Sequence, residues 1–147
     1  YLQNFATTVF LFRKDAREFY GISEEEVFDR AIQLYRRAID LEPENYDLAL
    51  DVAQSYYSIR PARSPEAVAA WSHALRIART EVQRENAHIH LARFKMREGL
   101  FDEARRHLTS VTNEFNVAVR DRVLRDLESR EKKAGLTGKT SLPVPIN

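Results

Sequence analysis

Three segments of the chain share one order of residues. Each has a small residue, a bulky residue four positions later, and a small or short residue three positions after that, which is the spacing of one helix face. The small and bulky pairs are Ala31 with Tyr35, Ala67 with Trp71, and Ala104 with Leu108. The second alanine follows the first by 36 residues, and the third follows the second by 37. The pattern therefore predicts three similar helices at a nearly constant interval.

A second set of small residues lies between these segments. Val52-Ala53 stands before Tyr56, and Leu91-Ala92 gives a weaker version of the same pattern. Small side chains allow two helices to approach closely, so we expect Ala53 and Ala92 where one helix crosses its partner. Only 4 Gly and 5 Pro interrupt the chain, which is few for a β protein, because its turns need such residues. We therefore predict an all-α fold built from antiparallel helix pairs.

This order of residues resembles the tetratricopeptide-repeat family over about residues 5–115. Repeats of that family are about 34 residues long, and the second helix carries a small residue, a bulky residue four positions later and a closing proline. Pro43 stands where the family places that proline, whereas Arg79 occupies the equivalent position of the next repeat. The resemblance implies a right-handed α-solenoid of about three repeats. The expected ranges are 2–43, 46–80 and 84–115 for the repeats, 117–133 for a capping helix, 1–134 for the whole domain and 135–147 for an extended or disordered tail.

The start of the chain predicts one amphipathic helix and a well-marked start for the next. The apolar residues that share one face of the opening helix are Phe5, Val9, Phe12, Ala16 and Phe19. Gly21 is expected to end this helix, and Ser23 with Glu26 predicts a capping box for the following one.

Two later signals define a helix start and the C-terminal cap. Ser64 is expected as an N-cap, with Pro65 at the first helical position. Near the C-terminus, one apolar stripe on an otherwise charged helix consists of Val119, Val123, Leu124 and Leu127. A helix with one apolar face is what a terminal repeat needs to cover its last hydrophobic surface.

Composition and charge exclude several function classes. With 23 basic and 22 acidic residues the formal net charge is +1, which argues against a broad nucleic-acid-binding surface. The chain has no Cys, so disulfides and thiolate metal sites are excluded. No apolar run approaches the roughly 20 residues of a membrane helix. The sequence opens at Tyr1, so we expect a removed upstream segment, such as a signal peptide or another repeat; the compartment, cytoplasmic or exported, stays open.

The histidines do not predict a metal site. His88 and His90 are two residues apart and so lie about 200° apart around a helix, whereas a metal-binding pair on one helix needs a spacing of three or four. His73 and His107 belong to other repeats of the expected fold.

The sequence offers no catalytic constellation either. Gly138-Lys139-Thr140 resembles the end of a phosphate-binding loop, but Lys133 occupies the position of the first glycine and no strand precedes it. No G-x-S-x-G elbow is present, and the run of glutamates from Glu24 is most simply explained by the dipole of a helix N-terminus. We therefore expect a protein that is not an enzyme and binds no cofactor.

The resemblance to the repeat family implies a concave groove that binds a peptide or a partner protein. The residues expected to face it are Asp47, Leu50, Gln54 and Tyr57 in the second repeat, Asn86, Ile89, Arg93 and Arg97 in the third, and Arg13, Arg17 and Tyr20 near the start. Some family members clamp a carboxylate at positions that are Asp51, Asn86 and His90 here, and these residues disfavour that ligand. Gln54, Tyr57, Arg93 and Arg97 suit an acidic or aromatic peptide instead.

Self-association is the alternative function. An exposed N-terminal edge with Phe5, Phe10 and Phe12, or the C-terminal helix, would then join two copies into a homodimer. A groove binder is expected to be monomeric and a self-associating module dimeric.

Overall fold

A computed structural model describes residues 2–135, and within this range the chain forms eight α-helices and no strand. The helices are α1 (Leu2–Leu11), α2 (Arg13–Tyr20), α3 (Glu24–Leu41), α4 (Tyr46–Ser55), α5 (Ser64–Ile77), α6 (Glu81–Arg97), α7 (Phe101–Thr109) and α8 (Glu114–Lys133). The all-α class predicted from the sequence is therefore confirmed for the described residues. The tail from residue 136, with its Gly138-Lys139-Thr140 segment, lies outside them.

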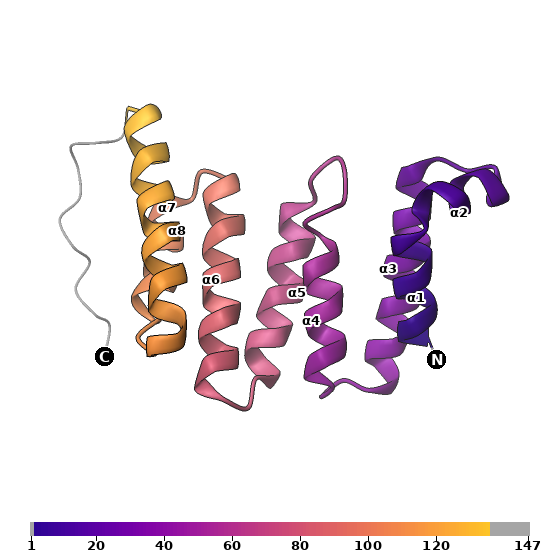
Figure 1. Cartoon of the computed structure of the whole chain (residues 1–147), viewed down its shortest axis with the longest axis horizontal. Coiled ribbons are helices and arrows are strands. Elements are labelled where there is room, and N and C mark those ends of the chain that lie inside the picture. Colours follow the sequence, from indigo (N-terminus) through magenta and orange to yellow (C-terminus); the bar gives the residue numbers. More distant parts are fainter. Residues whose placement is uncertain (1, 136–147) are drawn as a thin grey trace.

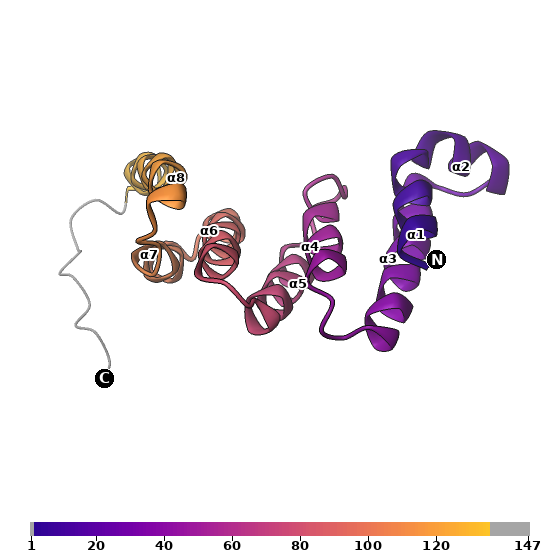
Figure 2. The ribbon, with the colours of Figure 1, turned by 60° about the horizontal axis from the view of Figure 1, so that its bottom comes forward.

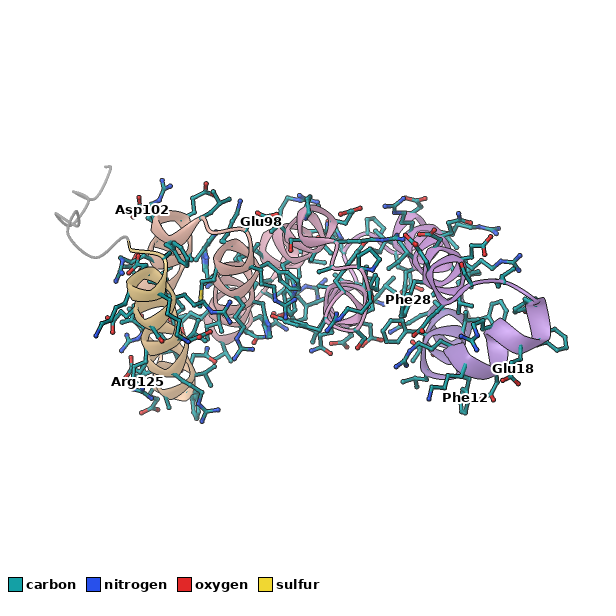
Figure 3. All side chains as sticks on the ribbon, turned by 90° about the horizontal axis from the view of Figure 1, so that it is seen from above. Phe12, Glu18, Phe28, Glu98, Asp102 and Arg125 are labelled. Atoms are coloured by element: carbon teal, nitrogen blue, oxygen red, sulfur yellow. The ribbon has the colours of Figure 1, made fainter. Side chains whose placement is uncertain are left out.

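The helices stand side by side in a single row that follows the order of the chain (Figure 1). Helix α1 packs along α3, α4 along α5, and α6 along α7, while α8 closes the row against α6 and α7. Seen from a second direction the row is a shallow arc (Figure 2). In the view from above, α1 and α8 extend further to one side than α4 and α6, so the side shared by these four helices is bowed inward (Figure 3).

The alanines of the repeated pattern lie where helices approach one another. Side chains that are fully or almost fully buried include Ala31, Ala53, Ala67, Ala92 and Ala104, together with the bulky residues Tyr35, Trp71 and Leu108. These burials agree with the sequence pattern, because a small residue permits close approach and the bulky one fills the adjacent space. Trp71 lies in the larger core between α3 and α6, and Leu108 in a second core beneath α8.

The N-terminal segment differs from its prediction. Instead of one helix with a buried face, the chain breaks at Phe12 (φ −95°, ψ 33°) between α1 and α2. The side chains of Phe5, Phe12 and Phe19 are 50%, 60% and 83% exposed. Phe10 instead packs on Phe28 at 5.6 Å between ring centroids. Because the segment after Phe12 is mostly charged, α2 has no buried residue to align with the apolar face of α1.

Two helix starts were predicted with different success. The capping box is confirmed, since Glu26 N donates to Ser23 Oγ at 3.2 Å and Ser23 N donates to the Glu26 carboxylate at 2.8 Å. The prediction for Ser64 is wrong by one residue, because Arg63 occupies the N-cap position and Ser64 is the first residue of α5. The Arg63 guanidinium binds Asp29 and Glu25 of α3, and these ion pairs hold the turn.

The C-terminal helix α8 begins three residues before the predicted start at 117 and covers α6 and α7 with the expected apolar stripe. Val123 and Leu127 are buried there. A buried carboxylate, Glu85 on α6, accepts backbone hydrogen bonds from Thr112 at 2.7 Å and Asn113 at 2.9 Å. Burial alone would raise the pKa of Glu85, but these hydrogen bonds, together with those from the side chains of Asn116 and Thr112, outweigh it and hold the pKa below its usual range. Glu85 thus ties the turn before α8 to α6.

Candidate functional site

The accessible side of α4 carries the residues that the sequence placed in a groove. Asn45 caps the helix by accepting a hydrogen bond from Leu48 N at 3.1 Å, which fixes where the helix starts. One side of α4 is then buried in the core, while Asp47 and Gln54 are exposed and Leu50 is partly buried. Tyr57 follows in the turn after the helix and is partly buried.

Helix α6 supplies the other half of this surface, with one correction to the prediction. Asn86 and Arg93 are partly exposed and Arg97 is exposed, but Ile89 is only 2% exposed and belongs to the core beneath α8. The residues on this side of α6 are Asn86, His90, Arg93 and Arg97, at spacings of four, three and four positions. The partly buried His90 takes the place predicted for Ile89. Ile89 is therefore not a groove residue.

His90 connects α6 with α5 and with the turn after α4, beneath this surface. The Tyr57 hydroxyl and His90 Nδ1 share a hydrogen bond of 2.7 Å. The His90 ring stacks on Trp71 of α5, with 4.1 Å between ring centroids and 9° between planes. Burial raises the pKa of Tyr57, whereas burial and the nearby charge of Arg93 lower the pKa of His90 to about 4. Both groups are therefore neutral at pH 7, and Tyr57 is fixed in position.

Two arginines lie beside the fixed tyrosine. The Arg97 guanidinium is 5.0 Å from the centroid of the Tyr57 ring and 4.8 Å from that of Phe94, both within the range of a cation–π interaction. The charge of Arg93 also acts on Tyr57. Neither arginine forms an ion pair with a carboxylate of residues 2–135. Their positive charges are thus available to a ligand.

Toward α1 the same side of the row is acidic and polar. A hollow of about 170 Å³ is lined by Thr7, Tyr35, Asp51 and Gln54, among others. Asp51 accepts a hydrogen bond from the side chain of Gln3 at 2.8 Å, which joins α4 to α1. The surface therefore has an acidic part with Asp47 and Asp51 on α4, and a basic part at the end of α6. We call this surface, from α1 across α4 to α6, the bowed face.

The N-terminal candidates do not lie on the bowed face. Arg13 and Arg17 are on α2, which packs only on α1 and α3 (Figure 1). Arg13 pairs with Glu24 at 2.9 Å. Tyr20 lies beside Arg30 of α3, with its ring centroid 4.9 Å from the guanidinium. The break at Phe12 explains this outcome, because it turns the second half of the expected opening helix away from α4.

The structure also brings together two histidines that the sequence analysis separated. Nδ1 of His88 on α6 lies 3.0 Å from Nδ1 of His107 on α7. Burial, together with the neighbouring His88, lowers the pKa of His107 to about 4, so the pair is neutral at pH 7 and one ring donates to the other. Within residues 2–135 no group of three or more potential ligands is placed to hold a metal ion.

Comparisons with known proteins add no identification. No protein-family model matches the chain, and a search of curated proteins finds no match. Among the described helices, none combines the length and the apolar character that crossing a membrane requires.

Proposed function

We propose that this chain is an α-solenoid of the tetratricopeptide-repeat type that binds a peptide or a partner protein on its bowed face. The proposal is supported by three successive helix pairs, α1 with α3, α4 with α5, and α6 with α7, in which alanines recur at equivalent places. It is also supported by the arc of the row, since repeated helix pairs that rotate slightly produce concave binding surfaces. Helix α8 takes the role of a terminal cap.

The main support for the proposal is that Tyr57, Arg93 and Arg97 lie together on the bowed face. Tyrosine and arginine are the residue types that most often dominate the binding energy of protein interfaces. Here Tyr57 is held by His90, and Arg97 rests on the Tyr57 ring. A side chain that is already held in place loses less conformational entropy when a ligand binds.

The charges indicate the chemistry of the ligand. Two guanidinium groups that pair with no carboxylate in the described part of the chain favour a peptide carboxylate at one end, because arginine can bind a carboxylate through two hydrogen bonds. Asp47 and Asp51 favour basic or hydrogen-bond-donating residues at the other end of the bowed face. Opposite charges at the two ends would fix the direction in which a peptide binds.

The proposed module is a binding protein and has no catalytic role. The titratable groups with shifted pKa values on this face include Tyr35, Tyr57 and His90. Tyr57 and His90 are hydrogen-bonded to each other, Tyr35 shares a hydrogen bond with Thr7, and His90 is stacked on the core residue Trp71. Their shifts follow from burial in a packed cluster.

A displayed library of short random peptides, selected on the wild-type chain, tests the proposal. We expect the selected peptides to be enriched in Asp and Glu and to bind at least tenfold more weakly, a difference of about 1.4 kcal/mol, to the R93E/R97E variant. The control variant R79E/R106E carries the same change in net charge at exposed positions away from the bowed face. An equal loss of peptide affinity in R93E/R97E and R79E/R106E, or no loss of affinity in either variant, would contradict the proposal.

Self-association is a second candidate, and the exposed Phe5 and Phe12 side chains favour it. Phe10, which the sequence analysis placed on the same edge, is partly buried and packed against Phe28, so less of its ring is exposed to a second copy. Light scattering over a range of protein concentrations separates the two candidates. A monomer at all concentrations supports the bowed face as a free binding surface, and a stable dimer supports self-association.

A further inference from the structure

A second surface lies at the N-terminal end of the row, on the side of α3 that faces away from α4. Ile32, Arg36 and Ile39 line the side of α3 toward α4 and α5. Arg30, Leu34 and Arg37 instead line an open hollow of about 450 Å³, whose other wall is formed by α1 and the end of α2. We call this hollow the end cleft.

The floor of the end cleft is apolar. Phe5 and Val9 of α1 face Leu34 of α3 across it. A further hollow of about 410 Å³ continues past Phe5 along α1, where Leu2 contributes to its wall. Phe5 is 50% exposed and lines both hollows, so the apolar lining continues around this side chain from one hollow to the other. Exposed apolar surface of this kind marks an interaction site, and a shallow trough between two helices fits a third helix.

The rim of the end cleft is basic. Arg30 and Arg37 are seven residues apart, so they stand about 10 Å from each other along one side of α3. Neither forms an ion pair with a carboxylate of residues 2–135. Glu26, one turn before Arg30, is held by the capping box with Ser23. The two guanidinium groups therefore offer a spaced pair of positive charges beside an apolar floor.

We propose that the end cleft binds an amphipathic helix of a partner protein, whose apolar stripe covers Phe5, Val9 and Leu34. Acidic residues seven positions apart on that helix face Arg30 and Arg37. This proposal is independent of peptide binding on the bowed face, because the two surfaces share none of these residues.

The charges argue against a second copy as the occupant. In a two-fold symmetric dimer both copies use the same patch, so the contact brings two basic rims into one interface. Like charges at such a contact oppose association. An acidic helix meets the same residues with opposite charge.

Two synthetic helical peptides test the proposal on the whole chain. Both carry the same leucine stripe, and they differ only in having Glu or Lys at two positions seven apart. In fluorescence anisotropy we expect the Glu peptide to bind the wild-type chain at least tenfold more tightly than the Lys peptide. In the R30E/R37E variant this preference should reverse, so that the Lys peptide binds more tightly. Adding Phe5→Ser should weaken binding of the Glu peptide to the wild-type chain and of the Lys peptide to R30E/R37E.

The controls separate this result from nonspecific charge and from misfolding. R79E/R106E carries the same change of net charge and should keep the preference for the Glu peptide, and circular dichroism should show unchanged helix content in every variant. Equal binding of the two peptides, no binding of the Glu peptide, or no reversal in R30E/R37E overturns the proposal. A wild-type dimer that Phe5→Ser converts to a monomer also overturns it, because a second copy then fills the end cleft.

Discussion

The central helices α4–α6 and the N-terminal helices α1 and α2 place their aromatic residues differently, while Phe28 and Tyr35 of α3 are buried like the aromatic residues of the centre. In the centre, Trp71 is fully buried and Tyr57 is fixed by His90. At the N-terminal end, Phe12 and Phe19 are exposed and Tyr20 contacts a surface arginine. Among the described helices, α4–α6 have neighbours on both sides along the row, whereas none lies beyond α1 and α2 at the N-terminal end. Position in the row, more than residue type, decides whether an aromatic side chain stabilises the fold or remains available to a partner.

The largest expected effect concerns Trp71 in the central helices. Replacing it with Ala should lower the free energy of unfolding by about 3–5 kcal/mol, because a large cavity is left in a packed core. Trp71→Phe should cost less, since a ring still stacks on His90 and the Trp71 Nε1 atom has no hydrogen-bond partner among residues 2–135 to lose. Urea denaturation measures both variants. A loss below about 1 kcal/mol for Trp71→Ala would show that the core does not depend on this side chain.

Acid should lower the free energy of unfolding by a smaller amount. This loss should come from the central and C-terminal helices, since all four histidines lie between His73 and His107. The pKa of His90 is lowered to about 4 in the folded chain by burial and by Arg93, from an ordinary value of 6.5. The unfolded chain therefore binds the proton more readily, and stability is lost as the pH falls from about 6.5 toward 4. Between pH 7 and 5 we expect His90 to account for a loss on the order of 1–2 kcal/mol.

Thermal unfolding at pH 7, 6 and 5 checks this expectation. His90→Phe keeps a ring against Trp71 but cannot be protonated, so its melting temperature should fall less steeply between pH 7 and 5 than that of the wild type. Equal slopes for the two proteins would mean that His90 is not buried as described.

The contrast between the two regions also explains how far the sequence could predict the molecule. The buried alanines, the Ser23 capping box and the apolar stripe of α8 follow from local spacing, which the chain alone contains. The break at Phe12 does not, because the apolar positions on both sides of it fit one continuous helix face.

The sequence analysis placed Ile89 on the groove side of α6, where the structure has His90, for a related reason. This helix contacts α5, α7 and α8, so its buried residues surround most of its circumference and define no single apolar stripe. With so little periodicity, Ile89 and His90 are equally plausible as surface positions. The contacts of His90 with Trp71 and of His88 with His107 depend on how neighbouring helices cross, which no local pattern contains.

The smallest expected effect belongs to the exposed aromatic residues of the N-terminal helices. Replacing Phe12 and Phe19 together with Ser should change the free energy of unfolding by no more than about 0.5 kcal/mol, because neither side chain is buried in the folded chain. Urea denaturation at two protein concentrations measures this change and detects association at the same time. A loss above about 1 kcal/mol that grows with protein concentration would show that these rings are covered by a second copy in solution. The same loss at both concentrations would show instead that Phe12 and Phe19 are buried within a single copy of the chain. The N-terminal aromatic residues would then not differ from the central ones in burial.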